Sequence, residues 1–309
     1  MGSTATGKSD LGVALARRLG GEVVSADASQ LYRGMDVGTA KLTVAERRGV
    51  PHHQLDVLEV TEEASVAAYQ RHARADVAAV LARGGVPVVV GGSGLYVRAL
   101  LDRLDIPPTD ARVRAEISSR LEREGVAALY GELAGLDPAA AAAIEPTNGR
   151  RVVRALEVIR VTGRPFSATM PRRDHVRPTV VLGLRMARET LDERVLRRTR
   201  AMFRRGLVAE THALVYLGLR EGRTASRAVG YAQALRVIDG GMTLEEATAD
   251  TALRTRRLAR RQESWFGADP RVHWLDALDP DLEARAVDFV AAGRAEVAGR
   301  GPERPGHLG

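Results

Sequence analysis

The first nine residues constrain this chain more than any other stretch. Gly2, Gly7, Lys8 and Ser9 fit the phosphate-loop pattern, a Gly and four further residues before Gly-Lys-Ser. Glycines let backbone N–H groups turn toward phosphate oxygens, the lysine brings a cation to the terminal phosphates, and the serine hydroxyl is a natural Mg²⁺ ligand. The amphipathic stretch 10–19 predicts a helix whose N-terminus favours an anion. The pattern therefore indicates a phosphate cradle, against the alternative of a plain glycine-rich turn.

The phosphate-loop pattern also requires a buried β-strand immediately before its first glycine, yet only Met1 precedes Gly2. That strand is normally central to the sheet. About five apolar side chains, at roughly 2 kcal/mol each, would equal the net stability of a typical domain. We therefore expect that the first core strand is missing from the chain as written, that the natural chain starts upstream, and that Met1 is an internal methionine.

Composition narrows the class of protein. The chain has 309 residues, 45% of them hydrophobic, with no apolar run of membrane-spanning length and no visible signal peptide. Cysteine is absent, which excludes disulfides and Cys-based zinc sites and fits a cytoplasmic protein. The net charge is +7, and Lys8 and Lys41 are the only lysines. Arginine binds phosphate and stacks on bases, so this excess suits nucleic acid, although a GC-rich genome would also produce it.

Hydrophobic patterning predicts an α/β protein. Strands are expected at 22–27, within 51–57, and at 86–90, 179–184 and 272–275. Helices are expected at 66–83, 95–101, 191–204, 208–217, 229–239 and 244–265. Asp27 ends the first of these strands, where α/β sheets place their chemistry, although it could merely cap the following turn. Ser93 lies in a glycine-rich loop that either approaches a ligand or makes a tight turn. The adjacent His52 and His53 are expected to be structural rather than metal ligands.

The middle of the chain differs from the rest. After Pro107-Pro108 the sequence is helical and rich in Ala and Arg, with helices expected at 113–124, 125–133, 138–144 and 150–162. This pattern indicates an all-helical insertion in an α/β core. We expect a first part of the core at 1–109, the insertion at 110–175, a second part with basic C-terminal helices at 176–298, and a disordered tail at 299–309.

Arginines gather in three predicted helices, starting near residues 150, 191 and 254. The third group is followed by Trp265 and Phe266, and rows of Arg near aromatics suit backbone contact with base stacking. A solvated helix face with i,i+4 ion pairs explains any single group at least as well. The third group has few carboxylates nearby, which favours binding of a polyanion there.

Several separated stretches, in order along about residues 1–275, resemble the tRNA dimethylallyltransferase (tRNA isopentenyltransferase) family. They are Gly2 to Ser9, Asp27-Ala28-Ser29-Gln30-Leu31-Tyr32, Gly34 to Lys41, Gly91-Gly92-Ser93-Gly94-Leu95-Tyr96, Arg154 to Val158, Val229-Gly230-Tyr231 and Arg260-Arg261-Gln262. The resemblance implies a phosphate-loop NTPase-like parallel-sheet core. It also implies transfer of a dimethylallyl group from dimethylallyl diphosphate to N6 of adenosine 37 beside a tRNA anticodon.

The resemblance also implies roles for particular residues. Asp27 would accept the N6 proton, Ser93 would contact the target nucleotide, and Arg198 would stabilise the leaving diphosphate. Residues that would bind the diphosphate are Gly2, Thr4, Ala5, Thr6, Gly7, Lys8 and Ser9, with Ser9 holding Mg²⁺. Residues that would contact tRNA are Asp27, Ala28, Ser29, Gln30, Ser93, Arg114, Arg150, Arg151, Arg154, Arg227, Tyr231, Arg260, Arg261 and Trp265.

The implied partners are dimethylallyl diphosphate and a tRNA anticodon stem-loop carrying A36-A37-A38, for a monomer that needs no membrane. Gly267 stands where the family has a basic residue, so one phosphate contact is expected to be absent. For Arg154, pairing with Glu157 or Glu145 competes with a phosphate contact. Two other functions fit parts of the sequence: a phosphate-loop kinase of small molecules that uses ATP, and an RNA-binding protein whose loop is vestigial.

Overall fold

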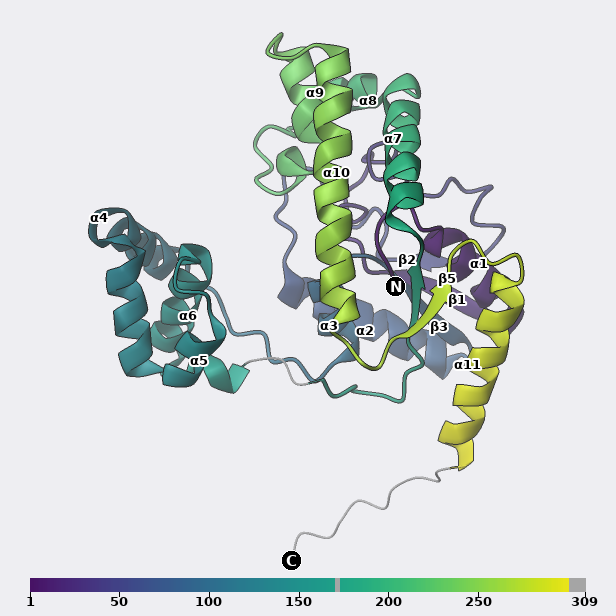
Figure 1. The fold of residues 1–309 in the computed structure, drawn as a ribbon, viewed down its shortest axis with the longest axis horizontal. Coiled ribbons are helices and arrows are strands. Elements are labelled where there is room, and N and C mark those ends of the chain that lie inside the picture. The colour runs from purple at the N-terminus through teal and green to yellow at the C-terminus, as the bar shows by residue number, and fades with distance from the viewer. Residues whose placement is uncertain (170–172, 300–309) are drawn as a thin grey trace, which may run out of the picture. The chain divides into compact units, whose positions relative to one another are not determined.

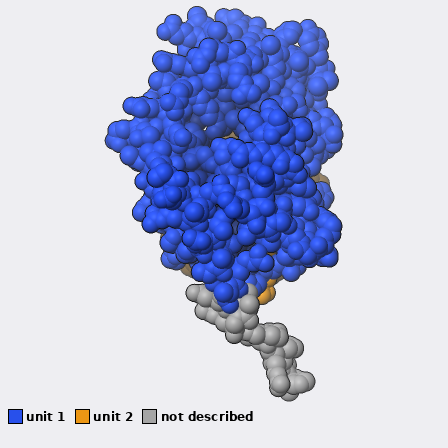
Figure 2. Space-filling view, turned by 90° about the vertical axis from the view of Figure 1, so that its right-hand side faces the viewer, with its two compact units in different colours: residues 1–101, 177–309 blue, residues 102–176 orange. Residues whose placement is uncertain are grey.

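A computed structural model of the chain describes residues 1–169 and 173–299. These residues form two compact units, one made of Met1–Leu101 with Arg177–Gly309, the other of Asp102–Val176 (Figure 1, Figure 2). Apart from Gly299, which ends a helix, the tail expected at 299–309 lies outside the described residues.

The larger unit contains two small parallel sheets. Strands β1 (Gly21–Ser25), β2 (His52–His53) and β3 (Val86–Val90) form one, in the order β2-β1-β3, and β4 (Leu182–Arg185) pairs with β5 (His273–Asp276) in the other. Met1 and Gly2 lie against the second sheet: the amide of Leu184 donates to the Met1 carbonyl at 2.9 Å, and Gly2 forms a single parallel bridge with Leu184. The strand expected before Gly2 would lie upstream of the first residue, so its existence stays a prediction.

Helices cover these sheets. Helix α1 (Lys8–Leu19) packs on β1, β3 and α11 (Leu282–Gly299), and α2 (Val66–Ala82) packs on α3 (Gly94–Leu101) and the three-stranded sheet. The contact between α1 and β3 is close, because a Cβ at Gly12 would lie 2.4 Å from a methyl group of Val90. The result is a mixed α/β core in which β1 and β3 run parallel, so that the loops that follow them lie at the same edge of the three-stranded sheet.

A second group of helices belongs to the same unit. It comprises α7 (Arg188–Arg204), α8 (Leu207–Tyr216), a 3₁₀ turn (Ala225–Arg227), α9 (Tyr231–Ile238) and α10 (Leu244–Gly267). The long helix α10 packs along α7 and α9 (Figure 1). Its start is fixed by a capping box, in which the Thr243 and Glu246 side chains bond each other's backbone amides. Their core is built around the fully buried Tyr32, Met35 and Leu207.

The regular elements of the smaller unit are helices, joined to the larger unit's chain by the non-helical segment 102–110. The smaller unit contains α4 (Ala111–Leu136), α5 (Pro138–Ala143), α6 (Gly149–Thr162) and a 3₁₀ turn (Phe166–Thr169) around one apolar cluster. The two helices expected at 113–124 and 125–133 lie within α4, which is interrupted between them at Gly125, whose φ of 79° is not helical. The Asp110 side chain caps its start by accepting from the amides of Arg112 and Val113.

Three features differ from the sequence-based expectation. Helix α11 was not expected, and it packs against α1 and β5. The strand expected at 179–184 begins only at Leu182, and the strand expected at 22–27 ends at Ser25, so Asp27 lies in the loop just beyond the sheet.

No helix in the described part of the chain combines the length and hydropathy needed to cross a bilayer.

Candidate active site

The loop before α1 has the geometry of an anion cradle. Ala5 and Gly7 have positive φ angles of 66° and 89°, which turn successive amides toward one side. The Thr6 hydroxyl donates to the Ser3 carbonyl at 2.9 Å and closes the loop internally. Gly2 permits close approach to the second sheet, because a Cβ there would lie 2.9 Å from the Leu184 carbonyl oxygen. The helix that follows adds its N-terminal dipole.

Two cations and one carboxylate meet beside this loop. Burial lowers the pKa of the Lys8 ammonium to about 8, whereas the Asp27 carboxylate raises it and Arg198 lowers it. Burial also lowers the pKa of Arg198, and Asp27 opposes that shift. Lys8 donates to the Ser3 carbonyl at 3.3 Å, and Arg198, from α7, donates to the Thr39 carbonyl at 3.4 Å. With one carboxylate for two cations, the site carries excess positive charge and favours an anionic ligand.

Two adjoining cavities share this charged centre. One of about 60 Å³ and one of about 320 Å³ are both lined by Thr4, Lys8, Asp27, Thr39 and Arg198. The smaller adds apolar side chains, Val23, Leu42, Leu55 and Val90. The larger extends to α10 and to the exposed Arg227. The arrangement offers a narrow cavity with a few apolar side chains on one side of the charges and a wider cavity, with apolar side chains such as Val195, Met202 and Leu258, on the other.

The loop after β1 holds Asp27 in place. One carboxylate oxygen of Asp27 accepts the Ser29 amide at 3.0 Å, and the other accepts no hydrogen bond from the described residues. The Ser93 hydroxyl accepts the Ala28 amide at 3.2 Å, so the glycine-rich loop after β3 supports the loop after β1. Asp27 therefore caps the turn and also lines both cavities, and its catalytic role stays a prediction.

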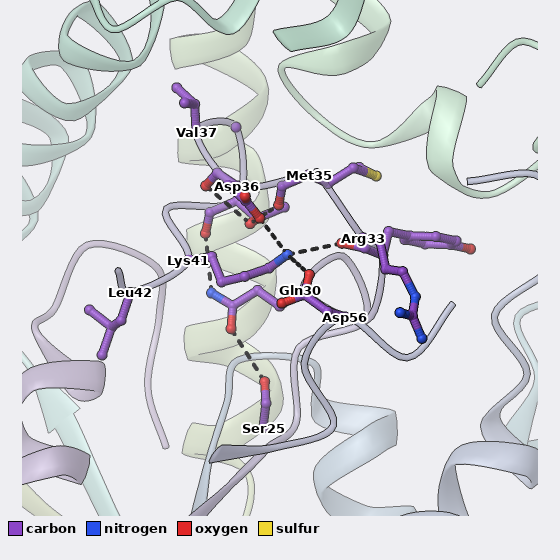
Figure 3. A network of polar contacts seen from close by, with 12 residues as sticks. Ser25, Gln30, Arg33, Met35, Asp36, Val37, Lys41, Leu42 and Asp56 are labelled. Atoms are coloured by element: carbon purple, nitrogen blue, oxygen red, sulfur yellow. Dashed lines mark hydrogen bonds and ion pairs between the residues drawn. The ribbon is translucent and has the colours of Figure 1, made fainter. Parts of the chain in front are cut away.

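Gln30 links this loop to the segment 34–41. The Ser25 hydroxyl donates to Gln30 Oε1 at 3.3 Å, and Gln30 Nε2 donates to the Thr39 carbonyl at 3.3 Å. Lys41, only 2% exposed, donates to the Tyr32 carbonyl at 2.9 Å and to the carboxylates of Asp36 and Asp56 at 2.6 and 2.5 Å (Figure 3). All three ammonium hydrogens are thus used within the protein. Lys41 thereby fixes the segment 34–41, of which Thr39 and Ala40 line the smaller cavity.

Tyr231 corrects one expectation. Its ring is fully buried, and its hydroxyl donates to Glu210 at 2.6 Å, while the same carboxylate accepts the Val37 amide at 2.8 Å. A Cβ at Gly38 would lie 2.4 Å from the Tyr231 ring. In this conformation the ring cannot touch a ligand, so Tyr231 supports the segment 34–41 from behind instead of contacting RNA.

The third arginine group presents an exposed surface on α10. Arg260 and Arg261 are exposed, and Trp265 is 46% exposed with its indole packed at Gly94, where a Cβ would lie 2.2 Å from Nε1. Arg254 donates to Asp250 at 2.6 Å, and the Arg260 guanidinium lies 3.9 Å from the Asp192 carboxylate. Part of this group is therefore an ion-paired helix face, and the exposed side chains of its C-terminal part can still meet a polyanion.

In the smaller unit, two of the expected RNA-binding arginines have structural partners. Glu157 is completely buried and accepts from Arg114 at 2.8 Å, from Arg154 at 2.9 Å and from the Asp110 amide at 3.0 Å. Arg154 also donates to the Pro107 and Pro108 carbonyls, at 2.8 and 3.2 Å. This network ties the start of the unit to α6. Arg150 and Arg151, by contrast, are exposed at the first turn of α6.

Metal binding would depend on a bound ligand. Ser9 lines the smaller cavity, but the described residues hold no group of three or more acidic or histidine side chains able to bind an ion by themselves. One hydroxyl beside an anion cradle fits Mg²⁺, which keeps most of its shell as water and phosphate oxygens. His53 pairs with Glu22 at 2.6 Å, and the His52 ring is hydrogen-bonded to the Val50 carbonyl at 2.8 Å, in agreement with a structural role for the histidine pair.

Gln262 belongs to the site although the sequence did not single it out as a site residue. From α10, its side chain accepts the Thr4 amide at 2.8 Å and donates to the Gly92 carbonyl at 2.9 Å. The one available signal was its position directly after Arg260 and Arg261. Together, the fold and site define an α/β enzyme with an anion cradle, a carboxylate between two cations, and an exposed basic helix.

Comparison of the sequence with known proteins shows to which enzyme family the chain belongs. A sequence model of the family described as IPP transferase matches residues 30–269. The tRNA dimethylallyltransferase of Nocardia farcinica is 58% identical over 299 residues, covering 96% of each chain. That of Streptomyces coelicolor is 59% identical over 275 residues, covering 89% of this chain and 88% of its own.

Solved structures agree. The crystal structure of the full-length tRNA isopentenylpyrophosphate transferase from Bacillus halodurans matches with a TM-score of 0.73 and 39% identity, covering 97% of this chain and 96% of the other. A eukaryotic dimethylallyltransferase captured acting on tRNA matches with a TM-score of 0.81 and 26% identity, covering 98% and 79%. The chain belongs to the IPP transferase family, the tRNA dimethylallyltransferases, and is a prenyl-transferring enzyme.

Proposed function

We propose that this enzyme transfers a dimethylallyl group from dimethylallyl diphosphate to N6 of adenosine 37, next to the anticodon of tRNAs carrying A36-A37-A38, and releases diphosphate. The observation that carries the proposal is the meeting of Lys8, Arg198 and Asp27 where the two cavities join. The relatives named above support the substrates, since their names specify dimethylallyl transfer and tRNA. We propose further that the core is of the phosphate-loop type and that the enzyme acts as a monomer in the cytoplasm.

The charges fit the leaving group. In the proposed complex the diphosphate lies in the loop from Gly2 to Ser9, where Lys8, Arg198 and backbone amides compensate the charge that builds up as the bond from C1 to oxygen breaks. Mg²⁺, held by Ser9 and diphosphate oxygens, would supply further charge compensation. The dimethylallyl group would lie against the apolar lining of the smaller cavity.

The carboxylate fits the nucleophile. An exocyclic amine is a poor nucleophile, so Asp27 would orient N6 and accept its proton as the bond from N6 to C1 forms. The Asp27 oxygen without a hydrogen bond from the described residues is the one available for this proton. The adenine would leave the anticodon stack and enter through the larger cavity, past Ala28 and Ser29.

Exposed cations would hold the rest of the tRNA. On the larger unit these are Arg227, Arg260 and Arg261, with Trp265 available for stacking, and on the smaller unit they are Arg150 and Arg151. Arg114 and Arg154 are expected to act mainly through Glu157, as supports for that unit.

The test uses labelled dimethylallyl diphosphate, Mg²⁺ and unmodified tRNA with A36-A37-A38. Wild-type protein should place the label on adenosine 37, and Asp27→Ala should lose turnover by about two to four orders of magnitude with tRNA affinity nearly unchanged. Asp288→Ala, which removes an exposed carboxylate on α11, is the matched control and should retain full activity. Absence of label in tRNA with folded wild-type protein would exclude the proposed reaction, and a loss of tRNA binding in Asp27→Ala as large as its loss of turnover would refute the proton-acceptor role.

A further inference from the structure

The Gln262 side chain connects two loops of the candidate site by hydrogen bonds. Its amide lies between two loops: Oε1 accepts the amide of Thr4, 258 positions away in the sequence, and Nε2 donates to the carbonyl of Gly92, 170 positions away. The two distances, 2.8 and 2.9 Å, are those of well-formed hydrogen bonds. The Gln262 side chain also lines the larger cavity.

The two loops that Gln262 joins have different tasks in the proposed reaction. Thr4 belongs to the cradle that includes Lys8, on the leaving-group side. Gly92 directly precedes Ser93, whose hydroxyl accepts the Ala28 amide next to Asp27, on the nucleophile side. A single side chain is thus hydrogen-bonded to the loop that would receive diphosphate and to the loop that supports the proton acceptor.

The fit at this point is close and chemically specific. A Cβ at Gly92 would lie 2.5 Å from Gln262 Nε2, so the glycine backbone admits the amide and leaves no room for a side chain. A neutral amide accepts and donates at once, which both contacts require. An ionised carboxylate would keep only the acceptor and would add negative charge beside the diphosphate cradle. A thioether of similar size would lose both hydrogen bonds.

We propose that Gln262 is a positioning residue for prenyl transfer, one that keeps the cradle and the Asp27 loop at the separation where diphosphate and the N6 proton acceptor flank the same carbon atom. The inference rests on the proposed function and deepens it. Because a misplacement of about 1 Å can cost about a hundredfold in rate, the effect should fall on the chemical step and not on substrate affinity.

The experiment measures single-turnover rates with saturating dimethylallyl diphosphate and tRNA for wild type, Gln262→Met and Gln70→Met. Gln70 is the matched control, because its Nε2 likewise donates to a backbone carbonyl, that of Ala99 at 2.9 Å, between α2 and α3. We expect Gln262→Met to lose at least about tenfold in rate with tRNA dissociation constants within about twofold, while Gln70→Met keeps its rate at a similar melting temperature.

A second variant keeps the test decisive if Gln262→Met fails to fold. Gln262→Glu retains the acceptor, and its protonated form regains the donor, so the ratio of its rate to the wild-type rate should rise as the pH falls from about 8 toward 5.5, nearer the ordinary Glu pKa of about 4.3. A flat ratio overturns the proposal, as does a Gln262→Met rate within threefold of wild type or an equal loss in Gln70→Met. If wild type itself transfers no label, it is the proposed function that fails, not the role of Gln262.

Discussion

Replacing Glu157 by Gln tests whether Arg114 and Arg154 stabilise the smaller unit. The Glu157 carboxylate is completely buried and accepts four hydrogen bonds: two from Arg114, one from Arg154 and one from the Asp110 amide. Gln keeps the shape, but its NH₂ group must face a guanidinium or an amide donor, and two cations lose their counter-ion. Breaking a buried ion pair costs about 3–5 kcal/mol. Arg114 is 48% exposed and recovers some hydration, so we expect a loss of about 2–3 kcal/mol.

The assay is urea unfolding of the full chain, with the transition of the smaller unit followed by circular dichroism. Glu116→Gln is the matched control, since Glu116 also connects α4 to α6 by pairing with Arg160 at 2.7 Å, but with both side chains 50% exposed. That surface pair should contribute at most about 1 kcal/mol. Equal effects of the two substitutions would refute the reasoning. An unchanged stability with tighter tRNA binding would show instead that the arginines act on RNA.

The same network predicts a pH dependence. Burial alone would raise the pKa of Glu157, but hydrogen bonds from Arg154, Arg114 and the Asp110 amide outweigh it and hold the pKa below its ordinary value of 4.5. A carboxylate whose pKa is depressed by folding stabilises the fold above the unfolded-state pKa and loses that contribution as the pH falls through the folded-state pKa. The stability difference between wild type and Glu157→Gln should therefore shrink below pH 4.5.

Three further predictions concern the larger unit. Because the pKa of Lys8 is about 8, the KM for dimethylallyl diphosphate should rise as the pH passes 8, and Lys8→Arg should abolish the rise; a flat wild-type profile from about pH 7 to 9 would contradict this. A Cβ on Gly91 would lie 2.2 Å from the Ala26 carbonyl oxygen, so Gly91→Ala should lower the free energy of unfolding by about 1–3 kcal/mol in urea titrations. Replacing Arg260 and Arg261 by Ala should weaken tRNA binding and reduce its logarithmic salt slope by up to about two, and an unchanged slope would exclude phosphate contact there.

Local sequence patterns were sufficient to predict most helices and strands. Patterns and family resemblance also singled out Lys8, Asp27 and Arg198, which line the same two cavities and whose roles stay predictions. Strand β3 has the predicted bounds because a run of Val between glycines allows little else. Asp27 and the loop of Ser93 lie together because the parallel strands β1 and β3 place their following loops at the same edge of the sheet, whereas Arg198 reaches the site from α7. Helix α11 was missed since its alanine-rich sequence has weak periodicity, and its place is decided by packing against α1 and β5.

The pairing of remote residues could not be predicted from spacing. Arg114 lies 43 positions from Glu157, and an arginine on a helix has the same pattern whether it faces RNA, water or a buried carboxylate. The family motif implied a tRNA contact for Tyr231, because a motif gives residue type but not burial. Gln262 acquires its role only when the fold brings Thr4 and Gly92 to its amide, and the sequence places these groups far apart.

The burial of Lys41 has a practical consequence for labelling this protein. Lys8 and Lys41 are its only lysines, and the ammonium of Lys41 is enclosed by three oxygen partners. Of the two lysines, acylating dyes, biotin esters and amine cross-linkers should therefore reach chiefly Lys8, which lines both cavities and whose pKa of about 8 leaves part of it as the free amine near neutrality. Lysine acylation would therefore mark the proposed diphosphate site, and protection from it would report occupancy of that site.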